Sequence, residues 1–311
     1  MQLPKLNNDI CSIIAKYLIE PKYKLLDWIN IMENNYFSLN PNAINFLREN
    51  PNIIDLYLLS LNPNAHELLK ENTSKINWDN LSINPNAFEL LKENQDKINW
   101  HLLSSNPNPK VIELLKENQD KIDWERLSEN PNAIELLNEN KDKIDWDYLS
   151  INPNAIELLK ENPHRINWEL LSENPNAIEL LRENPDKIHW DYLSSNPYAI
   201  ELIKEYSHKI DWYWLSSNPN AIELLKANPD KIDWFRLSLN PNAIELLQRN
   251  KDKIHWFNLS SNPNAIELLK ENQQKINYKM LSKNPSIFIL DDDNTNKDIE
   301  NKTIILNLIF S

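Results

Sequence analysis

The chain has 311 residues, a formal net charge of −13 and no glycine, whereas asparagine is abundant. Without glycine neither a Rossmann fingerprint nor a P-loop can form, because both need glycine where the backbone approaches phosphate. The single cysteine, Cys11, excludes internal disulfides and cysteine-based zinc clusters. The negative charge argues against a general affinity for nucleic acid, and no apolar run approaches the ~20 residues that span a bilayer. We therefore expect an intracellular protein that is neither secreted nor membrane-bound.

Segment 1–39 opens with Leu3-Pro4 and continues with Ile10, Ile14 and Leu18, which are spaced as on one face of a helix. This pattern resembles the start of an F-box, which opens with Leu-Pro and continues through two helices that end near Tyr-Leu. The resemblance implies that these five residues contact the Skp adaptor of a ubiquitin ligase, to which the protein would hand its targets. The alternative is a plain helical cap that covers the open end of the repeat stack.

An Asn-Pro pair recurs along the chain at a nearly constant spacing. Its asparagines are Asn40, Asn62, Asn84, Asn106, Asn130, Asn152, Asn174, Asn196, Asn218, Asn240, Asn262 and Asn284. Every interval is 22 residues except the one from 106 to 130, which is 24. Periods of this length are typical of solenoids and related repeat folds. Segment 40–289 is therefore expected to hold eleven full units and a truncated twelfth.

Residues 174–195, NPNAIELLRENPDKIHWDYLSS, represent the unit. Either Asn174, which precedes a proline, or Asn176, which has a glutamate three residues later, caps a first helix of roughly nine residues. Asn184 is expected to end that helix in a left-handed conformation, as glycine usually does. A second helix of roughly six residues starts near Trp190, and in most units an Asp or Asn before the tryptophan caps it. The next Asn-Pro stops this second helix.

Two short helices per unit predict an all-α solenoid of about twelve helix-turn-helix repeats, because such helices are stable only when stacking buries their apolar faces. A leucine-rich repeat of the same period would need an alternating L-x-L strand, which the unit lacks. With layers ~8–10 Å apart, we expect a rod or superhelix on the order of 100 Å long.

The phrase NPNAIELLKEN followed by KIDWxxLS recurs over segment 40–289. It resembles a tandem-repeat family found in many copies in giant DNA viruses of amoebae. The resemblance implies a viral protein in the host cytoplasm and carries no established activity.

Two residue types recur once per unit and form ladders along the stack. The aromatic ladder consists of Trp78, Trp100, Trp124, Trp146, Trp168, Trp190, Trp212, Trp234, Trp256 and Tyr278. The basic ladder consists of Lys75, Lys97, Lys121, Lys143, Arg165, Lys187, Lys209, Lys231, Lys253 and Lys275. We interpret the rings as core, each burying roughly 150–250 Å². The alternative is a stacking platform for single-stranded nucleic acid, although acids such as Asp142 and Asp145 flank the basic ladder.

No pattern in the chain indicates catalysis. The six histidines fall at four different places in the unit, and no H-E-x-x-H spacing occurs. A serine recurs two residues before each Asn-Pro, as at Ser150, and is expected to bond backbone at the helix end. We therefore predict a non-enzymatic protein with no catalytic residue, no metal and no cofactor.

The units differ most in the two residues that follow each tryptophan. The first of these is acidic in most of the earlier units and becomes Tyr213, Phe235 and Phe257 in three consecutive later ones. The second adds Trp214 and Arg236. Aromatic residues with arginine are enriched at binding hot spots, so we predict that these five residues bind a protein partner. The alternative is local packing of each ring over its own layer.

Segment 290–311 is expected to be a polar linker that begins at Asp291, followed by an apolar tail from Ile304 to Phe310. This tail is expected to fold back on the last unit, or to bind a partner. Taken together, the sequence predicts a repeat scaffold for protein–protein interaction, between virus and host if the resemblance holds.

Overall fold

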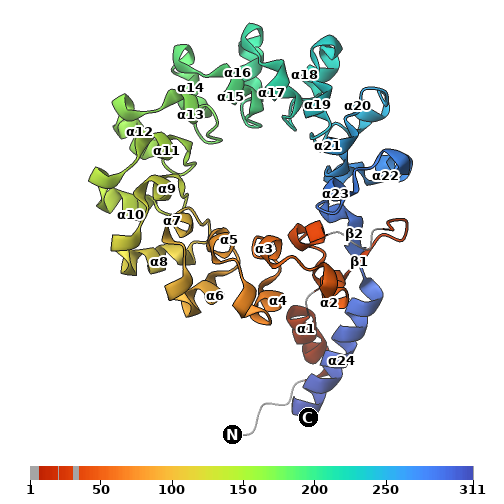
Figure 1. Cartoon of the computed structure of the whole chain (residues 1–311). Helices are drawn as coiled ribbons and strands as arrows, with labels where there is room; N and C mark the ends of the chain where they lie inside the picture. Colours follow the sequence, from red (N-terminus) through yellow and green to blue (C-terminus); the bar gives the residue numbers. More distant parts are fainter. Residues whose placement is uncertain (1–6, 20, 31–34, 311) are drawn as a thin grey trace.

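The computed structural model describes residues 7–19, 21–30 and 35–310 of the chain. Paired helices repeat along it, which confirms the all-α repeat fold. The repeats close into a ring, with one row of helices outside and a second row inside (Figure 1). The expected rod or superhelix is therefore wrong, and the reason lies in the contacts between the first and last units.

The outer helices are the first helices of the units, and all but α8 begin directly after an alanine. They are α2 (Ile44–Glu49), α4 (His66–Lys70), α6 (Phe88–Glu93), α8 (Lys110–Glu117), α10 (Ile134–Glu139), α12 (Ile156–Glu161), α14 (Ile178–Arg182), α16 (Ile200–Glu205), α18 (Ile222–Ala227), α20 (Ile244–Gln248) and α22 (Ile266–Lys270). The two extra residues of the long unit, at 108–111, lengthen α8 at its N-terminal end.

The inner helices begin at the tryptophan position. They are α3 (Leu56–Leu59), α5 (Trp78–Ile83), α7 (Trp100–Leu103), α9 (Trp124–Glu129), α11 (Trp146–Ile151), α13 (Trp168–Leu171), α15 (Trp190–Ser195), α17 (Trp212–Ser216), α19 (Trp234–Leu237), α21 (Trp256–Ser260) and α23 (Tyr278–Leu281). In most units one 3₁₀ turn joins the two helices. These turns are η2 (Pro51–Ile53), η3 (Thr73–Lys75), η4 (Gln95–Lys97), η5 (Gln119–Lys121), η6 (Lys141–Lys143), η7 (Pro163–Arg165), η8 (Pro185–Lys187), η9 (Ser207–Lys209), η10 (Pro229–Lys231) and η12 (Gln273–Lys275).

The start and end of the outer helix differ from the sequence prediction. Asn174 Oδ1 accepts the N–H of Asn176 at 3.0 Å, and this turn delays the helix until after Ala177. Neither candidate asparagine is therefore the helix N-cap, and α14 has five residues rather than about nine. Asn184 has φ −132°, and its side chain donates to the carbonyl of Leu180 at 2.9 Å. The left-handed cap is wrong, because no described residue has positive φ; the asparagine side chain satisfies the open carbonyl instead.

The inner helix follows the prediction at both ends. Asp145 caps α11 by accepting the N–H groups of Asp147 and Tyr148, each at 3.0 Å. Ser150, which is fully buried, donates to the Trp146 carbonyl at 2.8 Å. The same hydroxyl accepts the N–H of Asn167 in the next unit at 3.0 Å. Each such serine therefore ends its own helix and positions the start of the next inner helix.

The repeated Asn-Pro asparagine connects every unit to the one before it. Asn152 Nδ2 donates to the carbonyls of Ser128 and Asn130, both at 2.9 Å. The same pair of bonds recurs at all twelve asparagines, which are buried. We call this set the asparagine ladder. Because buried carbonyls need partners, the ladder fixes both the spacing and the register of the layers.

The asparagine ladder has no free end. Asn40, in the first unit, donates to the carbonyls of Ser282 and Asn284 at 3.0 and 2.8 Å, as if the last unit preceded it. Asn42 Nδ2 likewise donates to the carbonyl of Pro285 at 3.1 Å. One apolar core runs from Ile29 around the ring to Phe288. The stack is therefore closed by the same bonds that join consecutive units.

Both ends of the chain complete the twelfth unit. The C-terminal end of the chain supplies the turn η13 (Pro285–Ile287) and strand β2 (Phe288–Leu290). The N-terminal end of the chain supplies the inner element of this unit. That element is the 3₁₀ turn η1 (Asn35–Leu39), which contacts α3. Strand β1 (Tyr23–Leu25) pairs antiparallel with β2, with Tyr23 opposite Leu290. The unit that looks truncated in the sequence is thus assembled from two distant segments.

Two helices lie outside the ring, near both termini (Figure 1). α1 (Asn8–Leu18) packs against α24 (Asp292–Phe310), with Cys11, Ala15 and Leu306 buried between them. We call this pair the stalk. Residues 292–310 form one helix, not the expected polar linker and tail, and α24 pairs with α1. The expected cap over an open end is also absent from the described residues, because closure leaves no open end.

Candidate functional site: the inner belt

The inner helices carry one exposed stripe. Their leucine and serine, such as Leu149 and Ser150, are buried in the core, whereas the first residue after each tryptophan position is exposed. Because these helices form the inner row (Figure 1), this exposed stripe belongs to the inner side of the ring. We call the first and second residues after each tryptophan position the inner belt. Its first residues are Asn35, Tyr57, Asp79, His101, Glu125, Asp147, Glu169, Asp191, Tyr213, Phe235, Phe257 and Lys279. All of these twelve residues except Asn35 and Lys279 lie at the second position of an inner helix that starts with tryptophan or leucine.

Side chains of the inner belt contact each other across layers. The second belt residue of one unit reaches the first belt residue of the unit before it. Arg126 Nε donates to His101 Nε2 at 2.7 Å, and the guanidinium of Arg236 lies 4.3 Å from the ring centre of Tyr213. The ring closure repeats the pattern, because Lys279 Nζ lies 4.5 Å from the ring centre of Tyr36. The inner belt is therefore continuous around the ring.

Three of the predicted partner-binding residues form one row on the inner belt. Tyr213, Phe235 and Phe257 lie on α17, α19 and α21 and are 43%, 46% and 47% exposed. His255 lies between the last two rings, with centroid distances of 4.6 Å to Phe235 and 6.2 Å to Phe257. Leu239, 38% exposed, adds apolar surface one turn from Phe235. We call these five residues, with Trp214 and Arg236, the aromatic row.

Arg236 joins the first part of the aromatic row. Its guanidinium lies 4.3 Å from the Tyr213 ring centre and 4.1 Å from that of Trp214, and these two rings meet edge to face at 5.4 Å. Its Nε is buried and has no hydrogen-bond partner in the structure. An arginine held between two rings in this way is pre-organised, so a ligand would order few additional side chains.

Eight of the nine tryptophans of the aromatic ladder have a basic residue over one ring face. Each ring is partly buried against the core, and a basic residue of the next unit covers its face in most layers. Lys187 Nζ lies 4.3 Å from the Trp168 ring centre, and Arg165 lies 5.1 Å from that of Trp146. Equivalent contacts cover Trp78, Trp100, Trp124, Trp212, Trp234 and Trp256. The two ladders of the sequence are thus one structural feature, a cation–π contact between layers.

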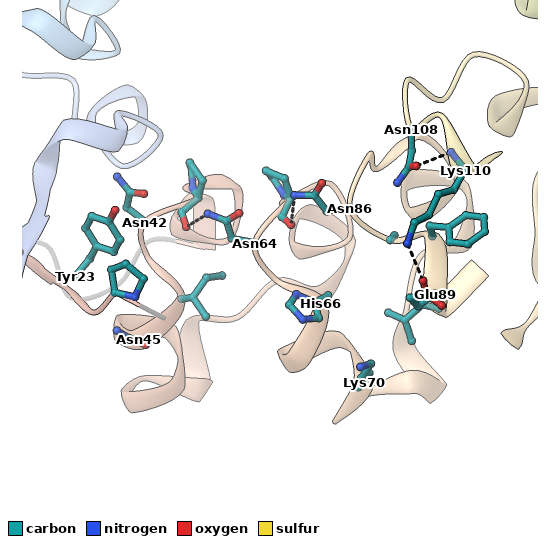
Figure 2. A pocket seen from close by; sticks show the side chains of 17 residues that line it. Tyr23, Asn42, Asn45, Asn64, His66, Lys70, Asn86, Glu89, Asn108 and Lys110 are labelled. Carbon is teal, nitrogen blue, oxygen red and sulfur yellow. Dashed lines mark hydrogen bonds and ion pairs between the residues drawn. The ribbon is translucent and has the colours of Figure 1, made fainter. Parts of the chain in front are cut away.

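A groove of about 670 Å³ crosses the first four units (Figure 2). Asn64 and Asn86 lie in a row on one side of it, and their amides donate to proline carbonyls of the preceding units. Its cations already have acidic partners: Lys110 lies 3.3 Å from Glu89, and Lys70 lies 3.2 Å from a glutamate oxygen. The groove therefore combines neutral amide groups with charged groups that are already paired, and His66 in it also lies 3.1 Å from a glutamate oxygen.

The predicted adaptor-binding residues lie on the stalk or outside the described residues. Ile10 and Leu18 are exposed on α1, and Ile14 is half-buried against the small core that α1 shares with α24. Leu3 and Pro4 lie outside the described residues. No helix follows α1 in residues 21–30, where the F-box resemblance would continue and where β1 lies instead.

Within residues 7–19, 21–30 and 35–310, no three His, Cys, Asp or Glu side chains are grouped so as to hold a metal ion. In the same residues no helix is long and apolar enough to cross a membrane. Comparisons of the chain with protein-family models, curated proteins and solved structures give no match. The fold and inner belt therefore define the protein by architecture alone, as a closed ring of helical repeats.

Sequence variation between units located the aromatic row but missed two of its members. The place of His255 in its unit gives no sign that it contacts the neighbouring rings. Leu239 follows Phe235 by four residues, the spacing of neighbours on one helix face. That spacing was the available signal for Leu239, whereas the position of His255 depends on how the layers stack.

Proposed function

We propose that the protein is a non-enzymatic scaffold that binds a protein partner through the aromatic row. One observation carries the proposal: three aromatic rings in consecutive units stay about half exposed at a position where five other units of the same fold have Asp or Glu. The unit therefore does not require an aromatic residue there. An exposed apolar patch on an acidic protein is typical of an interaction surface, and aromatic residues beside arginine are enriched at hot spots.

A protein partner fits this surface better than single-stranded nucleic acid does. A stacking platform needs open ring faces and a basic groove. The tryptophan faces are covered by basic residues of the next layer, and the chain carries a net charge of −13. The resemblance of the repeat to viral repeats makes a cytoplasmic host protein the partner to seek first.

The proposal is tested by changing Tyr213, Phe235 and Phe257 together to Asp, which restores the residue type of other units. Tyr198→Asn is the matched control, because Tyr198 is also exposed and stands where most units have asparagine. We expect an unchanged melting temperature and loss of the proteins that the wild type captures from cell lysate, measured by quantitative mass spectrometry. Unchanged capture by the triple variant would refute the proposal, and loss of folding would show that the rings are core.

A second candidate function is docking of a Skp-type adaptor on the stalk, which would make the protein a substrate adaptor of a ubiquitin ligase. The supporting observation is that α1 packs on α24 and exposes Ile10, Ile13, Tyr17 and Leu18. A pull-down with purified adaptor tests it, with Tyr17→Asp as the variant expected to lose binding. No binding by the folded wild type would end this candidate.

A further inference from the structure

The aromatic row continues directly into an acidic stretch of the ring. On α9 to α15, which precede α17 around the ring, the inner stripe carries six carboxylates, of which five are exposed and Glu129 is half-buried. They are Glu125, Glu129, Asp147, Glu169, Glu173 and Asp191, and we call them the acidic arc. None of the six forms an ion pair with a described residue. The adjacent Arg126 hydrogen-bonds His101 instead.

Two of these carboxylates lie where the fold gains nothing from them. Glu129 is the last residue of α9, and Glu173 follows the end of α13, where the helix dipole disfavours negative charge. Each lies four residues after another glutamate, Glu125 or Glu169, a spacing that places like charges side by side. Other units have isoleucine, serine, leucine or, in one unit, lysine at this place. Burial raises the pKa of Glu129; the nearby charge of Arg126 lowers it by less, and the charge of Glu125 raises it again.

Each glutamate pair has a tyrosine from the next unit beside it. A hydrogen bond to Glu125 raises the pKa of Tyr148, and the charge of Glu169 raises that of Tyr192. The two groups are equivalent and lie two units apart in the ring. Carboxylates next to an aromatic ring are the chemistry that holds an ammonium or guanidinium group, through charge-assisted hydrogen bonds and cation–π contact.

We infer that the occupant of the inner belt is a peptide segment with basic side chains beside apolar ones. Its lysine or arginine side chains lie on the acidic arc, and its apolar side chains lie on the aromatic row. The inference rests on the proposed function and names the chemistry of the partner at that same surface. Charge complementarity decides it, because the acidic arc repels phosphate and acidic peptides but attracts a basic segment.

The test is a selection of random peptides on the wild-type protein, followed by affinity measurement with the selected synthetic peptides. We expect enrichment of lysine or arginine together with aromatic or aliphatic residues. Affinity should fall at least tenfold when Glu125, Glu129, Glu169 and Glu173 are all changed to Gln, and it should weaken as salt rises. The matched control changes four exposed glutamates of the outer helices, Glu135, Glu157, Glu179 and Glu201, to Gln, which alters the net charge equally.

Selected peptides without basic residues would overturn the inference, as would an equal loss of affinity in the control variant or no enriched peptide at all. The same experiment distinguishes failure of this inference from failure of the proposed function. Peptides that lack basic residues but need Tyr213, Phe235 and Phe257 would support the aromatic row as a binding surface while refuting the basic partner. Melting temperatures of both glutamine variants establish that each protein is folded.

Discussion

Replacing one asparagine of the asparagine ladder should lower the free energy of unfolding by the same amount at the ring closure as in the middle of the stack. Asn40→Ala removes two hydrogen bonds, of 3.0 and 2.8 Å, and leaves the carbonyls of Ser282 and Asn284 buried without these donors. Asn152→Ala removes two bonds of 2.9 Å to equivalent carbonyls. The carbonyls of Asn284 and Asn130 keep the backbone N–H of Ile287 and of Ala133, so in each variant only the serine carbonyl is left without its donor. A buried acceptor without a partner costs about 1–3 kcal/mol, and each variant should therefore lose about 1–3 kcal/mol.

The assay is urea unfolding followed by tryptophan fluorescence, with both variants measured beside the wild type. In a closed ring the two losses should agree within about 1 kcal/mol, because both rungs have the same partners. In an open stack Asn40 would face no preceding unit, and its replacement would cost only the local bond to the N–H of Asn42. A large loss for Asn152→Ala with almost none for Asn40→Ala would refute the closed ring.

Four further substitutions test the contacts between layers, the charge of Glu129 and the stalk. Trp168→Ala should lower the free energy of unfolding by roughly 2–3 kcal/mol, measured by denaturant unfolding, because loss of the half-buried ring leaves a gap between layers. Lys187→Met should lower it by only about 0.5–1 kcal/mol, because this variant removes just the cation above that ring. Glu129→Gln should stabilise the protein at pH 7, because burial raises the pKa of Glu129 and the charged form is disfavoured when folded. Because protonation of Glu129 favours the folded state, the stability gain of Glu129→Gln should vanish as the pH falls below the unfolded pKa of about 4.3. The control is Glu93→Gln, at the exposed end of α6. An equal stability gain in the two variants would contradict this reasoning. Leu306→Asp should melt the stalk and leave the ring folded, since Leu306 is buried only between α1 and α24; loss of hydrogen-exchange protection in the ring would show that the stalk is needed for closure.

The sequence predicts the unit well because each unit repeats the same local signals. Residues within one unit are enough to predict three features. These are the helix cap at Asp145, the buried serines such as Ser150, and the end of the inner helix at each Asn-Pro. The helix starts were less predictable. The turn made by Asn174 and the amide bond of Asn184 to Leu180 compete with standard caps, and sequence alone does not rank them.

Closure was not predicted, because it depends on a small rotation between layers that accumulates over the whole stack. One signal was nevertheless present. Terminal units of an open solenoid are usually atypical, yet Ser38 and Asn40 at the start, and Ser282 and Asn284 at the end, keep the internal pattern. In all the remaining units these serines and asparagines form hydrogen bonds with an adjacent unit. Their presence in the first and last units therefore indicates that those units also have a neighbour on each side.

The aromatic row was predictable as far as one unit differs visibly from another. Tyr213, Phe235 and Phe257 stand out because the position is acidic in most of the earlier units. The contact of Arg236 with Tyr213 links different layers, so it depends on the stacking geometry and not on spacing within a unit. The helix dipole favours the acids at the helix N-termini, such as Glu125 and Glu169, but not Glu129 and Glu173 at the other helix end.

Covalent capture of the β1–β2 pair tests the closed ring most directly. Tyr23 and Leu290 face each other across the two strands, and cross-strand neighbours of this kind have Cβ atoms about 4.5–5.5 Å apart. Tyr23→Cys combined with Leu290→Cys should form an intramolecular disulfide on mild oxidation, seen as faster migration on non-reducing gels and mapped by mass spectrometry apart from Cys11. The two single variants control for bonds between molecules. A double variant that forms only intermolecular disulfides, or none, would contradict the closed ring.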